Sequence, residues 1–318
     1  MIRVAVVGVG EFGRNHVRVV KQSPRAELVA VVDANAARAA EVAAANGCVA
    51  LTDARELAGN ADAAIVAVPT SAHADVGCAL IEAGMDVLVE KPIAADLASA
   101  DRLIASAGVH NRILQVGHLE RFNPAVVALE KSARMPLFFE IHRMSVFSPR
   151  SLDVDVVLDL MIHDIDILLS LVHREIEEIR AAGISILTGK VDIANVRLQF
   201  EGGCVANLTA SRVSTDKVRK LRLFQPSQYI SVDYSRQDAA VFSVGADRQI
   251  SFQQLPVTKG EPLAMQFGAF LDSMETRQTP KLSGHAGRLS LRAALAILAK
   301  IEEHSRVVAQ SLVSGWKP

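Results

Sequence analysis

The run Arg3-Val4-Ala5-Val6-Val7-Gly8-Val9-Gly10-Glu11-Phe12-Gly13 decides how the first part of the chain folds. Its apolar start predicts a buried strand, and residues 14–22 after it predict a helix. Gly8 permits a tight turn, Gly10 lets a pyrophosphate approach the backbone, and Gly13 allows close packing of helix and strand. The helix N-terminus adds unpaired N–H groups and a positive dipole. The stretch therefore predicts a dinucleotide-binding turn.

An acidic residue follows at the distance that such a site requires. A second apolar strand is expected at 28–32, and it ends in Asp33, 20 residues after Gly13. A carboxylate there accepts hydrogen bonds from the ribose hydroxyls of adenosine. Because Ala34 and Asn35 follow and no arginine is adjacent, Asp33 would repel the ribose phosphate of NADP. The predicted cofactor is NAD.

Strands and helices keep alternating up to residue 119. This alternation indicates right-handed crossovers and a parallel sheet with helices on both faces. The expected elements are helix 37–45 ending near Gly47, strand 63–68, helix 74–83, strand 87–89, helix 96–107 and strand 113–116. We therefore expect an α/β Rossmann dinucleotide-binding domain over residues 1–119.

The stretch Val87-Leu-Val-Glu90-Lys91-Pro92-Ile93 places a charged pair at the end of a buried strand. Pro92 has no N–H to continue a central ladder, so the strand ends there. Ligands of open parallel sheets bind at the carboxyl ends of the strands, which makes Lys91 a candidate to meet a substrate. A strand that ends in solvated charge is the alternative. His73, just past another strand end, is a candidate cofactor or substrate contact, or else a helix cap.

The pattern changes after residue 119. Residues 137–144 predict a strand, 176–254 predict several strands separated by turns, and Glu201-Gly202-Gly203 is typical of a hairpin. Helices are expected at 153–172, 262–277 and 287–304. We therefore expect residues 120–318 to form an α+β domain with a mostly antiparallel open sheet, for substrate binding and oligomerisation. Pairing into a homodimer or homotetramer would bury the outer face of that sheet.

The helix expected at 153–172 is apolar around most of its circumference, which predicts burial. Its polar residues form one stripe, roughly 80° wide, that must face something polar. Asp159 and His163, four residues apart, are neighbours on the stripe. A catalytic or binding site, a buried structural histidine and a metal site are the three interpretations, and we favour the first. The stripe consists of Asp155, Asp159, His163, Asp166 and Ser170.

A basic cluster lies at 212–222. If its second half is a strand, Lys217 and Arg219 share one face, while Lys220 and Arg222 share the other. One of these faces could bind the diphosphate of a nucleotide sugar, although charges on an exposed strand are usually only solvated.

The composition excludes several classes of partner. The chain has 34 Lys and Arg against 35 Asp and Glu, so nothing favours binding to nucleic acid or to an anionic membrane. No run of about 18 residues lacks charge and the apolar start is too short for a signal peptide, so we expect a cytoplasmic protein. Cys48, Cys78 and Cys204 are scattered and lack metal-ligand spacing, so we expect buried thiols.

Together these residues resemble the glucose-fructose oxidoreductase, inositol dehydrogenase and MocA (Gfo/Idh/MocA) family along the whole chain. The resemblance implies NAD-dependent oxidation of a secondary sugar hydroxyl, with Lys91, Asp159 and His163 as the catalytic set. The chain departs from the family at Asp155-Val-Val-Leu158, where glycines are often found, and this affects the expected fit of the substrate. The matching motifs are Gly8-x-Gly-x-x-Gly13, Asp33, Val68-Pro-Thr-x-x-His73, Glu90-Lys91-Pro92, Arg121-Phe122-x-Pro124 and Asp159-x-x-x-His163-x-x-Asp166.

These arguments give a set of expected site residues, with no metal site among them. The residues expected to bind NAD are Gly8, Gly10, Phe12, Gly13, Asp33, Pro69, Thr70, His73, Glu90 and Lys91. The residues expected to bind the substrate are Lys91, Arg121, Asp159 and His163, together with Arg150 and Arg219.

A narrower likeness points to the UDP-N-acetylglucosamine 3-dehydrogenases within this family. These bacterial enzymes supply a 3-keto nucleotide sugar to an aminotransferase in lipid A synthesis, and the likeness implies that substrate here. Oxidation of another sugar or of inositol, glycoside cleavage with NAD as a redox relay, and a non-catalytic NAD-binding regulator remain alternatives. The likeness lies in Gly117-His-Leu-Glu-Arg-Phe-Asn-Pro124, Ser148-Pro-Arg150, residues 153–166, Ser211-Arg-Val-Ser214 and Lys217-Val-Arg-Lys-Leu-Arg-Leu-Phe-Gln-Pro226.

Overall fold

The computed structural model describes residues 1–147 and 154–313, with side chains up to residue 310. The chain divides into two compact units. The first unit comprises Met1–Leu119 and Glu261–Leu291, and the second comprises Glu120–Gly260 and the chain from Arg292 onward. One break falls where we expected a domain boundary, but residues 261–291 lie in the first unit and not in the second.

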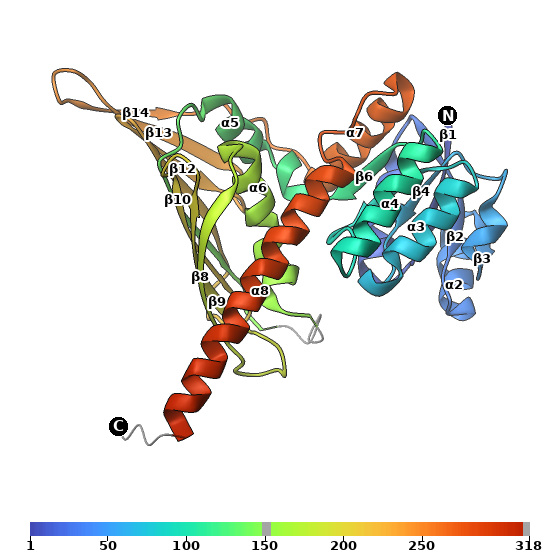
Figure 1. Ribbon diagram of the computed structural model, residues 1–318. Helices are drawn as coiled ribbons and strands as arrows, with labels where there is room; N and C mark the ends of the chain where they lie inside the picture. Colours follow the sequence, from blue (N-terminus) through green and yellow to red (C-terminus); the bar gives the residue numbers. More distant parts are fainter. Residues whose placement is uncertain (148–153, 314–318) are drawn as a thin grey trace. The chain divides into compact units, whose positions relative to one another are not determined.

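The first unit contains a six-stranded parallel sheet, sheet A, in the order β3-β2-β1-β4-β5-β6 (Figure 1). The order reverses between β1 and β4, as in the Rossmann fold that the alternation predicts. We did not expect β3, because it is three residues long and mostly exposed and so carries no apolar run. The strands are β1 (Ile2–Val7), β2 (Ala26–Val32), β3 (Val49–Leu51), β4 (Ala63–Val66), β5 (Asp86–Glu90) and β6 (Leu114–Gly117).

Helices cover both faces of sheet A. Right-handed crossovers put α1 and α2 on one face and α3 and α4 on the other, because the strand order runs in opposite directions from β1. α7 joins α1 and α2 through Phe267 and Phe270, which share their apolar core, and this contact explains why residues 261–291 belong to the first unit. The helices are α1 (Glu11–Gln22), α2 (Ala36–Asn46), η1 (Ala54–Leu57), η2 (Thr70–Ala72), α3 (His73–Glu82), α4 (Leu97–Val109) and α7 (Pro262–Thr276).

The second unit contains an eight-stranded sheet, sheet B, in the order β14-β13-β12-β11-β7-β10-β9-β8. Only β7 and β10 pair in parallel, so the predicted, mostly antiparallel sheet is confirmed. The predicted hairpin joins β9 and β10 through Gly202 and Gly203, which both have positive φ. The strands are β7 (Phe138–Met144), β8 (Ile176–Ile184), β9 (Ile193–Phe200), β10 (Val205–Ser211), β11 (Val218–Gln225), β12 (Gln228–Asp233), β13 (Asp238–Val244) and β14 (Ile250–Gln254).

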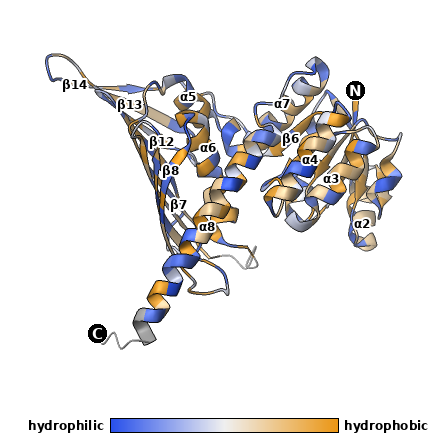
Figure 2. Ribbon diagram, in the orientation of Figure 1, coloured by the Kyte–Doolittle hydropathy of each residue, from blue (hydrophilic) through white to orange (hydrophobic). Residues whose placement is uncertain are grey.

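One face of sheet B is the core of the second unit. Its buried residues pack against α5, α6 and the part of α8 after residue 291. Figure 2 shows hydrophobic and hydrophilic residues alternating around α8, as expected for a helix with one buried side. We did not expect α5, although Asn123 caps its first turn and Pro124 follows at the first position. The helices are η3 (Leu119–Phe122), α5 (Pro124–Ser132), η4 (Val157–Met161), α6 (Ile162–Val172) and α8 (Gly284–Val313).

None of the helices in the described parts of the chain is long and apolar enough to span a membrane.

Candidate active site

The glycine turn before α1 has the geometry that a bound pyrophosphate requires. Gly8 has φ +87°, and a Cβ there would lie 2.5 Å from the carbonyl oxygen of Ala67. A Cβ on Gly13 would lie 1.9 Å from the carbonyl oxygen of Gly8, so only glycine lets α1 start this close to the turn. A Cβ on Gly10 would meet nothing within 4 Å. Neighbouring backbone atoms therefore crowd Gly8 and Gly13, whereas nothing crowds Gly10.

The start of α1 fits the phosphates of NAD. Gly10 is the N-cap residue, and because it has no side chain it does not cap the first N–H groups of the helix. These N–H groups and the helix dipole favour an anion, and the open space at Gly10 gives it access. Phe12, in the first turn, is 40% exposed and its ring meets His16 edge-on.

Asp33 ends β2 and is held by the turns around it. Its Oδ2 accepts a hydrogen bond from the N–H of Val9 at 3.0 Å, and its Oδ1 accepts one from the N–H of Asn35 at 2.9 Å. Arg38, in the first turn of α2, lies 3.3 Å from Oδ2 through Nη1. The residues adjacent to Asp33 along the chain gave no indication of this arginine, which the helix turn brings back over the carboxylate.

His73 connects two loops: the loop after β4, which contains Pro69 and Thr70, and the loop after β5. It is 1% exposed, with Nδ1 2.9 Å from the carbonyl oxygen of Pro92 and Nε2 2.9 Å from that of Val68. Burial lowers the pKa of the ring, although both carbonyl groups act to raise it. The N-cap of α3 is Ala72, and both ring nitrogens of His73 lie at loop carbonyl oxygens, so the helix-cap alternative is wrong.

Glu90 is the last residue of β5, and Lys91 follows it before the cis peptide bond to Pro92. The Glu90 carboxylate is buried, with Oε1 2.7 Å from Nε2 of His16 and Oε2 3.2 Å from the N–H of Lys91. We did not identify His16 from the sequence. Its position on the apolar side of α1, beside Val17 and one turn after the glycine pattern, could have indicated a buried histidine near the site.

The strand register brings the predicted residues of the first unit to one edge of sheet A. Val7 of β1 lies opposite Val66 of β4, which lies opposite Val89 of β5. The carboxyl ends of these parallel strands therefore lie level with one another. The predicted residues at this edge are Gly8, Asp33, Pro69 and Lys91.

Asp159 and His163 lie in the second unit, where a π-helical turn meets α6. The turn is η4, and the N–H of Ile162 bonds to the carbonyl oxygen of Val157 five residues back. Single π-helical turns of this kind are frequent at functional sites. The helix is buried as predicted, and His163 is 8% exposed. Its expected start at residue 153 lies outside the described residues.

The other residues of the predicted polar stripe have structural partners. Asp155 accepts a backbone hydrogen bond at 2.9 Å, and Ser170 donates to a carbonyl oxygen of its own helix at 2.7 Å. Asp166 lies 3.4 Å from Nη1 of Arg121. These contacts tie Asp155, Asp166 and Ser170 into the fold of the second unit.

A buried ion network connects α6 with sheet B. Arg143 of β7 donates to both carboxylate oxygens of Asp164, at 2.7 and 2.8 Å, and to Glu120 at 3.0 Å. Burial opposes the charge of Arg143, but the two carboxylates outweigh it and raise the pKa of the guanidinium. Arg219 lies 3.4 Å from Glu120, and burial together with the charge of Arg143 lowers its pKa. Arg143 and Asp164 are 21 residues apart, on a strand and a helix, so local sequence gives no sign of their pairing.

The predicted basic cluster is divided by the fold. Arg219 lies on the inner face of β11, whereas Lys220 and Arg222 lie on the outer face. Lys217 is exposed and precedes the strand. Arg212 is buried and donates to a backbone carbonyl group.

Arg121, another arginine predicted to bind substrate, lies in η3 just before α5. Arg121 is 8% exposed, and its Nε lies 3.0 Å from Glu130 of α5. With its contact to Asp166, this guanidinium links α5 and α6. Arg150 lies outside the described residues.

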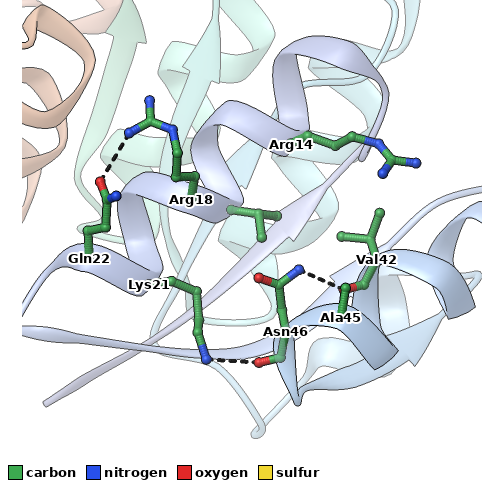
Figure 3. Close-up of a pocket in the computed structure, with 8 residues that line it drawn as sticks. Arg14, Arg18, Lys21, Gln22, Val42, Ala45 and Asn46 are labelled. Atoms are coloured by element: carbon green, nitrogen blue, oxygen red, sulfur yellow. Dashed lines mark hydrogen bonds between the residues drawn. The ribbon is translucent and has the colours of Figure 1, made fainter.

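A basic groove of about 330 Å³ lies between α1 and α2 (Figure 3). Arg14 in its lining pairs with Glu41 at 3.0 Å. Arg18 donates to Gln22 at 3.0 Å, and Lys21 donates to a backbone carbonyl of α2 at 2.9 Å. Its cations are thus engaged within the unit, and the glycine turn remains the better candidate for a phosphate site.

The cysteines have no redox or metal partner in the described parts of the chain. Cys48, Cys78 and Cys204 are free thiols, and burial raises the pKa of Cys204 to about 11. Within residues 1–147 and 154–313, no group of three or more His, Cys, Asp or Glu residues could hold a metal ion.

Both units of the chain match known protein families. Residues 2–118 match a model described as an oxidoreductase family with an NAD-binding Rossmann fold, and residues 136–225 match the GFO/IDH/MocA C-terminal domain. A UDP-N-acetylglucosamine 3-dehydrogenase of Acidithiobacillus ferrooxidans is 36% identical over 95% of this chain and 97% of its own. A solved structure of that enzyme has a TM-score of 0.90 at 35% identity and covers 95% of this chain and 98% of its own.

More distant relatives include inositol dehydrogenases. An inositol 2-dehydrogenase of Rhizobium meliloti is 30% identical over 67% of this chain and 70% of its own. A myo-inositol 2-dehydrogenase of Thermotoga maritima is 25% identical over 98% of this chain and 100% of its own. The glycine turn, Asp33 and these matches agree, and the chain therefore belongs to the GFO/IDH/MocA family and is an NAD-dependent oxidoreductase acting on a CH–OH group.

Proposed function

We propose that this oxidoreductase oxidises the C3 hydroxyl of UDP-N-acetylglucosamine to a 3-keto nucleotide sugar. The observation that carries the proposal is the similarity to a UDP-N-acetylglucosamine 3-dehydrogenase, which extends through both units. The ketone is a substrate for an aminotransferase, and we place the reaction before such a step in lipid A synthesis. The free thiols suit a reducing compartment, so we propose a cytoplasmic enzyme.

We assign the chemistry to Lys91, Asp159 and His163. An imidazole titrates near neutrality, so His163 is the base that takes the hydroxyl proton. The Lys91 ammonium stabilises the developing alkoxide, and Asp159 orients the imidazole or holds a neighbouring hydroxyl. The glycine turn and Asp33 would hold NAD, which would supply the acceptor for the hydride of C3.

We assign substrate binding to these three residues together with Arg121, Arg219 and Arg150. Arg219 is the arginine of β11 whose side chain remains 30% exposed on the inner face of sheet B. Its carboxylate contact at Glu120 is a single 3.4 Å approach, which leaves most of its five N–H donors for a diphosphate. Arg121 is bonded to two carboxylates and would act chiefly by holding α5 and α6.

The experiment is a measurement of NADH absorbance after mixing the protein with NAD and UDP-N-acetylglucosamine, with a carbonyl trap to draw off the ketone. We expect NADH to form only with both substrates, and turnover to disappear in Lys91→Ala and in His163→Ala, while the Kd for NAD in His163→Ala stays within about twofold. Lys259→Ala, an exposed lysine, is the control. Loss of NAD affinity in His163→Ala would contradict the role assigned to His163.

Inositol is the second candidate substrate, because inositol dehydrogenases are also relatives. NADH formed with myo-inositol and not with the nucleotide sugar would replace the substrate and leave the dehydrogenase assignment intact. Cleavage of a glycoside without net NADH would instead identify the redox-relay reaction.

We also propose that the protein assembles through the outer face of sheet B. Five aromatic residues lie directly opposite one another across five strands of this face, and consecutive ring centroids are 5.0 to 5.6 Å apart. Phe252 at one end is 61% exposed. Such a contiguous aromatic surface on an open sheet favours pairing with a second copy. The aromatic ladder consists of Phe138, Phe224, Tyr229, Phe242 and Phe252.

A further inference from the structure

His16 is a fully buried histidine that the mechanism above does not use. Its Nε2 lies 2.7 Å from Oε1 of Glu90, and its Nδ1 has no hydrogen-bond partner among the residues that the structure describes. A ring with the proton on Nε2 donates to the carboxylate and leaves no N–H unpaired. This tautomer is therefore the most favourable one in a buried position.

Glu90 receives two donors at once. Its Oε1 faces His16, and its Oε2 accepts the backbone N–H of Lys91 at 3.2 Å. An ionised carboxylate accepts at both oxygens, whereas a protonated one would turn an oxygen into a donor that faces another donor. The N–H of Lys91 is thus held by the side chain of the residue before it.

Gly117 of β6 lies against the Glu90 carboxylate. A Cβ on Gly117 would lie 2.8 Å from Oε1 of Glu90. Gly117 does not have a positive φ, so the carboxylate and not the backbone conformation requires glycine here. The next residue after Lys91 is also held, because the carbonyl oxygen of Pro92 lies 2.9 Å from Nδ1 of His73.

We propose that His16 and Gly117 are positioning residues for Lys91. His16 binds the Glu90 carboxylate and Gly117 leaves room for it, and the carboxylate fixes the amide of Lys91 and so the direction in which the lysine leaves the sheet edge. The inference rests on the proposed catalytic role of Lys91 and deepens it. Because α1 also starts at the glycine turn, one helix sets both the phosphate site and, through His16, the lysine. A shift of about 1 Å in a catalytic group can reduce the rate on the order of 100-fold.

Four variants separate positioning from stability. His16→Leu removes the donor, while His16→Gln keeps an N–H close to the place of Nε2. Gly117→Ala displaces the Glu90 carboxylate from the opposite side, and a flexible side chain can yield to it without loss of the fold. Val20→Ala, a fully buried position on the same helix, is the control that lowers the melting temperature without touching Glu90.

Hydrogen exchange at the Lys91 amide, measured by NMR in the NAD-bound protein, tests the inference without reference to turnover. We expect exchange to be faster by about tenfold in His16→Leu and Gly117→Ala, and close to wild type in His16→Gln and Val20→Ala. Unchanged exchange in Gly117→Ala would overturn the proposal, and this variant decides the question if His16→Leu does not fold.

Steady-state kinetics provide the second readout. We expect kcat to fall roughly 100-fold in His16→Leu and Gly117→Ala with little change in KM for NAD. In His16→Gln we expect kcat to stay close to the wild-type value. Equal losses in Val20→Ala would show a merely structural role and overturn the proposal. A wild-type protein that does not oxidise UDP-N-acetylglucosamine would contradict the proposed function, whereas the exchange measurement would still decide the role of His16.

Discussion

We expect Asp33 to decide which dinucleotide the first unit accepts, and we expect Arg38 beside it to allow that choice to be reversed. The carboxylate suits ribose hydroxyls and repels a ribose phosphate, but the guanidinium 3.3 Å away would attract that phosphate. We predict that Asp33→Ser weakens NAD binding about tenfold and strengthens NADP binding, measured as Kd by fluorescence.

Two further variants make this prediction specific. The gain in NADP affinity should disappear in Asp33→Ser/Arg38→Ala, because the arginine is its source. Asp53→Ser, which removes the carboxylate of an exposed aspartate–arginine pair in the same unit, should leave both affinities unchanged. An unaltered ratio of the two affinities in Asp33→Ser would contradict the role of Asp33.

Asp192 stabilises the second unit in a pH-dependent way. Its carboxylate is fully buried and accepts N–H bonds from Ile186, Leu187 and Thr188 at 2.7, 2.6 and 2.9 Å. Burial acts to raise its pKa, but these hydrogen bonds outweigh burial and lower the pKa from 3.8 to about 2. The contribution is therefore complete above pH 4 and is lost as the pH falls toward 2.

We predict that Asp192→Asn lowers the free energy of unfolding at pH 7 by about 2 kcal/mol, because an amide cannot replace the charged acceptor. Urea unfolding at several pH values is the measurement. The difference between wild type and variant should shrink below pH 4. Asp216→Asn, at an exposed site, should show no such dependence, and a difference that stays constant at low pH would contradict the argument.

At the scale of elements, the ion pair of Arg143 and Asp164 determines how α6 and its π-helical turn attach to sheet B. We predict that Arg143→Met costs about 3–5 kcal/mol, because it leaves a buried carboxylate unpaired. The double variant Arg143→Met/Asp164→Leu should recover part of this loss, because Glu120 still loses its bond to Arg143. Urea unfolding measures both, and equal stability of the single and double variants would contradict the prediction. Arg222→Met breaks a half-exposed pair and should change stability by less than about 1 kcal/mol.

At the scale of the whole molecule, the aromatic ladder predicts self-association. We expect light scattering to give a dimer or tetramer for the wild type and a smaller mass for Phe224→Glu/Phe252→Glu, because two buried charges at the interface would be unpaired. Ile186→Glu, at a position that is 57% exposed away from the ladder, should leave the mass unchanged. A monomeric wild type would contradict the assembly proposal.

Local patterns predicted most of the fold because they repeat at the period of the element they form. Apolar runs ending in glycine, proline or aspartate indicated five of the six strands of sheet A, and the turn residues indicated the antiparallel sheet. β3 escaped because it has only three residues, mostly exposed, and so shows no period. α7 was identified as a helix but assigned to the wrong unit, because the sequence does not show that Phe267 and Phe270 cover β1 and α1.

The candidate site divides in the same way. The sequence by itself determined the glycine turn, Asp33, Lys91 and the buried helix with Asp159 and His163, because each of these depends on spacing within one element. Only the tertiary structure decided which charges meet across elements: Arg38 with Asp33, His16 with Glu90, and Arg143 with Asp164. Such pairs join residues on different helices and strands, so packing, and not local sequence, brings their charges within bonding distance.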